Sequence, residues 1–231
     1  MDSRRTITMA LTFNILDWKA WTPAQDDAQP DVSAIPAMLR RRLSPIARAA
    51  MSVIMPLAQT YGAMPLVYVS RHGDLNRTLG LLEELARAEP LSPAAFSLSV
   101  HNATAGLFSI QQGLTQNIIA LSAGAEDLVP ALLEAIGLCN PHTPRVLCVF
   151  SDEPPPPVYA HQVAQPAQPY AVALVVESGR GWQLEHSTSA STGDLPAEPQ
   201  ALQLLALLQQ QSTQLRLPSN TSQWQLRRYC A

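Results

Sequence analysis

Residues 92–125 read SPAAFSLSVHNATAGLFSIQQGLTQNIIALSAGA, and this stretch decides what fold to expect. The pattern predicts a helix rich in small residues over 100–112, followed by a short buried strand over 117–121. A Ser-Ala-Gly turn then leads into a helix from about 126 to 136 and a strand over 145–150. Strand, helix and strand in succession indicate a βαβ unit, and hence an α/β fold with a largely parallel sheet.

Elements on the N-terminal side of this unit are expected to alternate in the same way. Residues 6–18 are rich in β-branched and aromatic side chains and predict a strand. A helix is expected to begin at Ser44-Pro45 and to be kinked or shortened by Pro56. The apolar run 65–70 predicts a strand buried on both faces. Asp74 should cap a helix with one apolar face, formed by Leu75, Leu79, Leu82 and Leu85.

The C-terminal part of the chain follows a break at the four prolines 154–157, which form either a rigid linker or a surface loop. Two apolar segments, 171–177 and 182–186, flank Ser-Gly-Arg-Gly and predict a hairpin. These elements would be marginal on their own, so we expect residues 1–231 to form a single domain. The remaining segments are expected to be a helix over 199–211 and a strand over 224–229.

The composition describes a chain with a sizeable core and no excess of basic charge. Of its 231 residues, 47% are hydrophobic and 14% are charged, with a formal net charge of −3. Nucleic acid is not an expected partner, because phosphate binding requires a local excess of Lys and Arg. No segment reaches the ~20 apolar residues of a membrane span. Cys139, Cys148 and Cys230 form no C-x-x-C pair and are expected to be free thiols in the cytoplasm.

Motifs that identify common enzyme classes are missing from the sequence. It contains no G-x-S-x-G, no Walker loop, no G-x-G-x-x-G and no H-E-x-x-H pattern. The five histidines are scattered without metal-ligand spacing, so we expect neither a metal nor a cofactor. One catalytic alternative stays open, in which Ser122 or Cys139 acts with a distant histidine, as in a small hydrolase or acyltransferase.

The order of motifs between residues 92 and 153 resembles the N-terminal half of a β-ketoacyl-acyl carrier protein synthase. The similarity is carried by Ser92-Pro-x-x-Phe96-Ser-Leu-Ser-Val100-His101-Asn102-Ala103-x-Ala105-Gly106, the Ser122-Ala-Gly turn and the segment 146–153. Arg41-Arg-Leu-Ser-Pro-Ile-Ala-Arg48 resembles the preceding segment in the branch found in bacterial aryl polyene clusters. The resemblance spans most of residues 1–155. It implies a thiolase-like α/β fold, half of a ketosynthase, in which helices cover both faces of a mostly parallel mixed sheet.

Ketosynthases of this fold place a nucleophilic cysteine at the end of a strand and the N-terminus of the next helix, where the helix dipole lowers the thiol pKa. The matching turn here reads Leu121-Ser-Ala-Gly-Ala125, so the nucleophile position falls on Ala123 or Gly124. Neither side chain can carry an acyl group. The family's two catalytic histidines come from a second half whose patterns are missing from this sequence. The resemblance therefore implies no catalytic residue.

Non-catalytic relatives of this kind are chain length factors, which pair with an active ketosynthase. The resemblance implies a heterodimer with a full-length ketosynthase subunit, contact with acyl carrier protein, and a share in shaping the acyl tunnel. Candidates for the interface or tunnel are Phe96, His101, Asn102, Gly106, Phe108 and Ser122. Candidates for carrier-protein docking are Arg40, Arg41 and Arg42, a basic run that suits an acidic helix.

Each candidate has a purely structural interpretation beside the functional one. His101 and Asn102 can satisfy backbone groups at a helix start, and Gly106 can fit a tight core. Phe96 and Phe108 can be core residues, and the arginine run can be a solvated helix end. A third functional alternative is a homodimeric scaffold that binds carrier protein without a ketosynthase.

Overall fold

The computed structural model describes residues 7–23, 29–162, 166–188, 198–210, 212–218 and 223–229. Cys230 and Thr6, for which the sequence makes expectations, lie outside these residues. None of the helices in the described part is long and apolar enough to cross a lipid bilayer.

An eight-stranded sheet organises the described residues, with strand order β3-β2-β4-β5-β1-β6-β8-β7. The strands are β1 (Ile7–Trp21), β2 (Leu66–Val69), β3 (Ile118–Leu121), β4 (Arg145–Asp152), β5 (Tyr170–Ser178), β6 (Trp182–Ser187), β7 (Gln214–Pro218) and β8 (Gln223–Arg228). The helices are α1 (Ala37–Arg40), α2 (Pro45–Tyr61), α3 (Leu75–Ala86), α4 (Pro93–Ser97), α5 (Ala103–Gln112), α6 (Leu128–Leu138) and α7 (Gln200–Leu208). Two short 3-10 helices are η1 (Gly124–Glu126) and η2 (Pro157–Tyr159).

Local capping sets three of the helix starts. The side chains of Ser44, Asp74 and Ser92 each accept a hydrogen bond from the backbone N–H three residues further on, which begins α2, α3 and α4. Pro56 lies inside α2, yet the helix continues to Tyr61. Of the two predicted effects of Pro56, shortening does not occur, because packing of the apolar face of α2 outweighs one lost backbone hydrogen bond, and a kink stays a prediction.

Pairing in the sheet is mostly antiparallel, so the predicted predominance of parallel pairing is wrong. Among the described strands, β2 runs parallel to both of its neighbours, β3 and β4. The other pairs are all antiparallel. The expected succession of strand, helix and strand is present as β3, α6 and β4, and both strands run parallel to β2, which lies between them. In contrast, β1 pairs with β5 and β6, which are distant in sequence. The α/β class and the presence of helices on both faces are confirmed.

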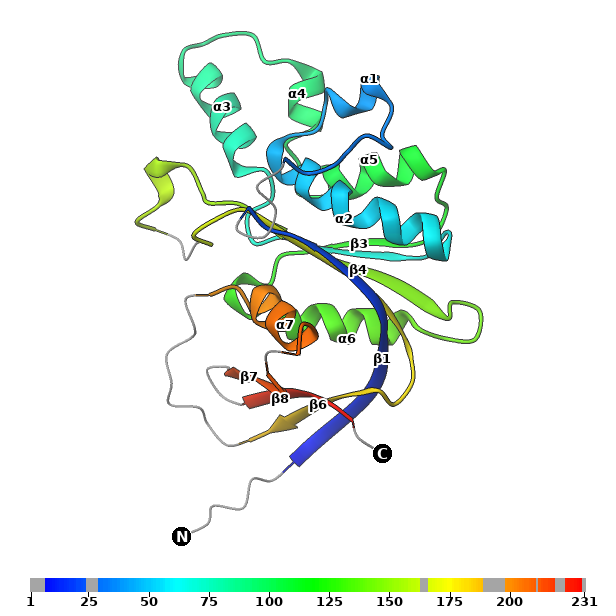
Figure 1. Ribbon diagram of the computed structural model, residues 1–231. Helices are drawn as coiled ribbons and strands as arrows, with labels where there is room; N and C mark the ends of the chain where they lie inside the picture. Colours follow the sequence, from blue (N-terminus) through cyan, green and yellow to red (C-terminus); the bar gives the residue numbers. More distant parts are fainter. Residues whose placement is uncertain are drawn as a thin grey trace.

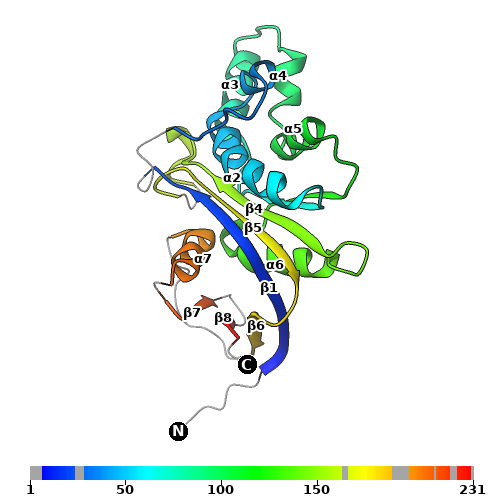
Figure 2. The ribbon, with the colours of Figure 1, turned by 45° about the vertical axis from the view of Figure 1, so that its right-hand side comes forward.

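Two arms of the sheet share the strand β1. Its segment 13–21 pairs with β5, and its segment 7–13 pairs with β6. The sheet curls along this strand, so that β6, β8 and β7 lie across from α6 and α7 (Figures 1 and 2). We call β6, β8 and β7 the curled arm. The helices α2 and α5 cover the opposite face of the main sheet.

The central strands are buried on both faces, as their continuous apolar runs predict. Alternate residues of β4 and β5 enter two separate cores: Leu147 and Val175 pack toward α2, whereas Cys148 and Leu174 pack toward α6 and α7. Burying each of the larger side chains is worth about 1.5–3 kcal/mol. The prolines 154–157 belong to the connection between the neighbouring strands β4 and β5, and Pro155 and Pro156 are buried.

The predicted hairpin between 171–177 and 182–186 is wrong in its pairing, because β1 lies between β5 and β6. Instead, the side chain of Asn14 on β1 lies in the turn at residues 178–181. Its Oδ1 accepts a hydrogen bond from the backbone N–H of Gly181 at 2.7 Å, and its Nδ2 donates to Glu177 at 3.3 Å. A Cβ atom at Gly179 would overlap the Asn14 side chain. Close approach by β1 therefore accounts for the glycine at this position.

The substitution Gly179→Ala is expected to destabilise the protein by about 1–3 kcal/mol, because the new methyl group displaces a hydrogen-bonded side chain. The cost should shrink in the double variant with Asn14→Ala, which removes the obstructing group. Urea unfolding of the wild type, both single variants and the double variant measures the coupling. Strictly additive costs would show that Asn14 and Gly179 do not contact each other.

Candidate functional site

Polar residues gather where the parallel strands β2, β3 and β4 reach their carboxyl ends. Ser70 and Arg71 follow β2, Ser122 follows β3, and Asp152 ends β4. Asp127 comes shortly after Ser122, at the start of α6. This edge of an open α/β sheet is where ligands and reactive groups usually lie. We call Ser70, Arg71, Ser122, Asp127 and Asp152 the strand-end cluster.

Asp152 ties β4 to the loop after β2. Its Oδ1 accepts hydrogen bonds from the Ser70 hydroxyl at 2.8 Å and from the backbone N–H of Arg71 at 2.9 Å. Its Oδ2 accepts from the Tyr170 hydroxyl at 3.3 Å. Asp152 is buried, and this burial raises the pKa of its carboxyl group. Three donors therefore fix the carboxylate as a structural acceptor for the loop.

A buried pair of opposite charges completes the cluster. Arg71 Nε and Asp127 Oδ2 are 4.0 Å apart, and the two side chains are 4% and 1% exposed. This separation is too long for a hydrogen bond, and neither oxygen of Asp127 has a hydrogen-bond partner among the described residues. Burial raises the pKa of Asp127 to about 7, although the charge of Arg71 opposes the shift. Burial of the Asp127 carboxylate therefore costs free energy, and the charge of Arg71 offsets only part of this cost.

The turn after β3 presents Ser122, Ala123 and Gly124. Ala123 precedes η1, and Gly124 has a φ of +63°, in the left-handed region that favours glycine. Ser122 is exposed, and its hydroxyl donates a 2.7 Å hydrogen bond to the backbone carbonyl of Arg71. Its proton is therefore held by an acceptor that cannot act as a general base. This geometry does not activate Ser122 for attack.

Neither described cysteine has the environment of a reactive thiol. Cys139 lies at the C-terminal end of α6, and burial raises its pKa, whereas nucleophilic cysteines need a lowered pKa. Cys148 is fully buried in β4, and burial raises its pKa as well. The hydrolase or acyltransferase alternative therefore gains no support from Ser122 or Cys139.

His101 lies against the strand-end cluster. Its Nε2 is 2.8 Å from the carbonyl oxygen of Ser70, and a Cβ atom at Gly73 would lie 3.2 Å from its ring. Asn102 is exposed and makes no side-chain capping bond to α5, so its structural interpretation as a helix cap is wrong. Nothing lies within 4 Å of a Cβ built on Gly106, so the tight-core interpretation of that residue is wrong. The structure brings only His101 and Ser122 of the predicted interface residues to the cluster.

The two phenylalanine candidates lie in different environments. Phe108 is buried against α2, whereas Phe96 on α4 is 60% exposed and is not a core residue. Leu82 and Leu85 on α3 are 47% and 59% exposed, and Leu81 is the buried leucine of that helix. The C-terminal part of the predicted apolar face of α3 is therefore not covered in this chain, whereas Leu75 and Leu79 are half-buried. Helices α3 and α4 stand together beyond the sheet (Figure 1).

The arginine run keeps its side chains at the surface. Arg41 and Arg42 are exposed and Arg40 is half-buried, and the described residues offer none of them an ion pair. The guanidinium groups of Arg48 and Arg77 donate to the backbone carbonyls of Arg40 and Arg42 at 2.9 and 3.1 Å. The backbone of the run is therefore fixed while its charges remain available.

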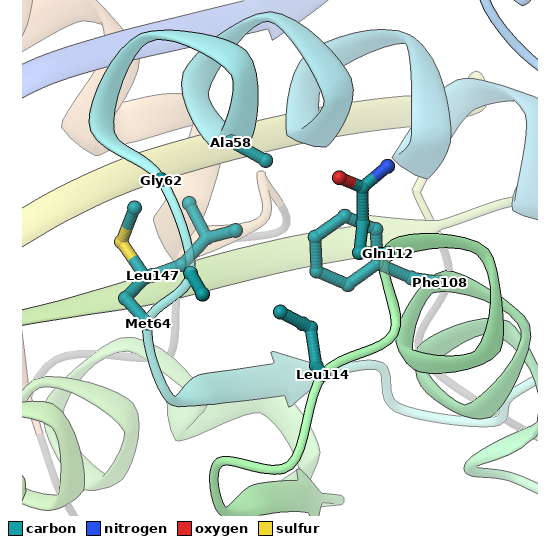
Figure 3. A pocket seen from close by; sticks show the side chains of 8 residues that line it. Ala58, Gly62, Met64, Phe108, Gln112, Leu114 and Leu147 are labelled. Atoms are coloured by element: carbon teal, nitrogen blue, oxygen red, sulfur yellow. The ribbon is translucent and has the colours of Figure 1, made fainter.

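A small cavity of about 100 Å³ lies near the amino ends of β2 and β4, where α2 ends (Figure 3). Phe108 and Gln112 of α5 face it, together with Met64 and Leu147. The Gln112 amide donates to the Met55 sulfur at 3.5 Å. None of the lining residues can act as a nucleophile or as a general acid or base, so this cavity supplies no chemistry.

Comparisons with known proteins agree with this architecture. A family model described as β-ketoacyl synthase, N-terminal domain, matches residues 17–226. A structure of the ketosynthase ApeO in complex with its chain length factor ApeC from Xenorhabdus doucetiae matches with 29% identity and a TM-score of 0.83, over 94% of this chain and 100% of the matched chain. A β-ketoacyl synthase from Burkholderia phymatum STM815 shares the fold with 14% identity and a TM-score of 0.51, over 71% of this chain and 52% of its own. No curated protein matches the chain.

Asp127 should make the stability of the protein depend on pH. Its pKa is raised in the folded state, so the folded protein holds this proton more tightly than the unfolded chain, and stability falls as the pH rises from about 4 to about 7. Asp127→Asn mimics the neutral acid and should be more stable than the wild type at pH 8, with a smaller difference at pH 5. Urea unfolding at both pH values measures this. A variant that loses stability at pH 8 would show that the pair with Arg71 is net stabilising.

Proposed function

The chain belongs to the β-ketoacyl synthase N-terminal domain family, and from this we propose that it is a non-catalytic chain length factor that pairs with an active ketosynthase during acyl-chain elongation. The turn after β3 carries the proposal. The position that the family resemblance assigns to the nucleophile falls on Ala123 or Gly124, and the hydroxyl of Ser122 is bound to a backbone carbonyl. The match over the whole of a chain from the ApeO–ApeC complex supports the same assignment.

We propose that the ketosynthase pairs with the free edge of β3. In the described part of the chain, β3 bonds on one side, to β2. The N–H groups of Leu66 and Ser70 donate to the carbonyls of Asn117 and Leu121. Odd-numbered residues of β3 therefore bond inward, and alternation leaves the N–H and C=O groups of Ala120 directed outward. A short apolar edge of this kind is suited to pairing with a strand of another chain.

Exposed apolar side chains support an obligate partner. Several large apolar residues of α1, α3, α4, α5 and their connections are exposed, and a partner chain could cover them. The free chain is therefore expected to self-associate, and interfaces of the obligate type are large and apolar. These residues are Met38, Leu82, Leu85, Leu91, Phe96, Val100 and Ile110.

The remaining parts of the proposal concern organisation and place. We treat residues 1–231 as one domain, because β1 belongs to both arms of a continuous sheet. We place the protein in the cytoplasm, where the free thiols of Cys139 and Cys148 stay reduced. Its carrier-protein contact is assigned to Arg40, Arg41 and Arg42, whose charges suit an acidic docking helix.

Co-expression with an active ketosynthase of this family tests the central proposal. We expect a one-to-one complex by size-exclusion chromatography with mass determination, and elongation that requires both subunits. Ser122→Ala should leave elongation unchanged within about twofold, because this hydroxyl is only a donor to a carbonyl. A monodisperse homodimer indifferent to the ketosynthase would favour the scaffold alternative, and loss of activity in Ser122→Ala would revive the catalytic one.

Ala120→Pro in the same experiment tests the β3 edge. Proline removes an outward N–H without breaking a bond to β2, so the free protein should keep its stability while the complex weakens by about tenfold or more. Ala120→Val, which keeps the N–H group, is the matched control. Unchanged affinity in Ala120→Pro would place the partner elsewhere.

Charge reversal at Arg41 and Arg42 tests carrier-protein docking. The double variant Arg41→Glu with Arg42→Glu should weaken binding of acyl carrier protein to the complex by about 3- to 10-fold, because exposed ion pairs contribute little individually. Arg216→Glu, at an exposed position of β7, is the matched control. The difference in affinity between the wild type and the double variant should be smaller at high salt than at low salt. Equal effects of both charge reversals would show that the arginine run is a solvated helix end and not a docking site.

A further inference from the structure

A second cavity, of about 200 Å³, lies where the curled arm of the sheet meets α6. One wall consists of Val129, Pro130 and Leu133 from α6, and the other consists of Leu217, Pro218 and Trp224 from β7 and β8. Glu126 and Gln200 complete the lining. None of these residues belongs to the strand-end cluster or to β3, so this cavity is separate from the surfaces assigned to the ketosynthase and the carrier protein.

The aromatic wall of this cavity is held in place. Trp224 on β8 is the direct cross-strand partner of His186 on β6. Their ring centroids are 4.7 Å apart, at an interplanar angle of 50°. Trp224 itself is half-buried, which leaves part of the indole facing the cavity. A rigid indole face of this kind favours stacking with a flat ring.

Two polar groups are placed in otherwise apolar walls. Gln200 is 3% exposed, and its Oε1 accepts a 3.2 Å hydrogen bond from the backbone N–H of Leu128. This is the only hydrogen bond of the Gln200 side chain within the described part of the chain, so its amide NH2 group remains a free donor in the lining. Glu126 adds a carboxylate, which disfavours a second anion. Apolar walls with a few placed polar groups are typical of small-molecule sites.

The size and surroundings of the cavity point to a small ligand. An apolar cavity of ~150 Å³ holds benzene, so this one has room for a ring with a short substituent. The described residues of α6, α7, β7 and β8 contribute none of the exposed large apolar side chains, so the cavity is not part of a broad apolar surface. We infer that this cavity binds a small uncharged aromatic compound with a carbonyl oxygen, its ring against Trp224 and its oxygen accepting from Gln200.

Titration of the full chain with benzamide tests the inference. The probe signal is the indole N–H resonance of Trp224 in 15N-labelled protein, identified by its loss in Trp224→Phe. We expect a saturable shift with a Kd on the order of 1 mM, as befits a ligand with few heavy atoms. Benzene, which lacks the oxygen, should bind about 3- to 10-fold more weakly. Benzoate should bind more weakly than benzamide because of Glu126.

Variants of the lining separate this site from non-specific binding. Leu133→Trp fills the cavity and should abolish the shift, whereas Val158→Trp, at an exposed position of η2, should leave it unchanged. Gln200→Met should give benzamide and benzene the same Kd, because the donor to the oxygen is removed. If Leu133→Trp does not fold, Trp224→Leu provides the same test, read from the backbone amide of Leu133. A non-saturable shift, binding that survives Leu133→Trp, or benzoate and benzene binding as tightly as benzamide would each overturn the inference.

Discussion

Backbone hydrogen bonds along β1 join the main sheet to the curled arm, and the rest of the structure depends on this link. The strand pairs with β5 over its second half and with β6 over its first half, and Phe13 at the junction has partners on both sides. Without β1, β5 and β6 would each lose a neighbour, and the core around α6 and α7 would lose the link between the main sheet and the curled arm. Phe13 is fully buried in that core. The strand-end cluster, the β3 edge and the cavity beside Trp224 all depend on the sheet that β1 completes.

Features encoded locally could be predicted from the sequence, and those set by distant contacts could not. The caps at Ser44, Asp74 and Ser92 and the doubly buried strand β2 follow from neighbouring residues. Strand pairing did not follow, because the segment Ser-Gly-Arg-Gly at 178–181 looks the same whether its flanking strands pair with each other or receive a third strand between them. The contact that distinguishes the two cases joins Asn14 to a turn far along the chain.

The candidate site also combines features that are encoded locally with features that are set by distant contacts. The turn at Ser122–Gly124 could be located from the order of motifs, and residue type alone shows that Ala123 and Gly124 have no nucleophilic side chain. The pairing of Arg71 with Asp127 could not, since neither residue has a local signature and the two meet only when β2 and β3 align. The positions of Leu82, Leu85 and Phe96 misled the prediction for a different reason. Helical spacing identifies an apolar face but does not say whether the same chain covers it.

The pairing of β1 has a consequence for biosynthesis. Asn14 bonds to Glu177, a sequence separation of 163 residues. At typical translation rates of ~5–20 residues per second, a ribosome needs roughly 10–30 s to add that many residues. Throughout this interval the nascent strand has neither of its neighbours, and its apolar side chains and free amides are open to chaperones and to other nascent chains. The sheet can therefore be completed only late in synthesis, when β5 and β6 become available to pair with β1. Its rate of formation is governed by the closure of long loops.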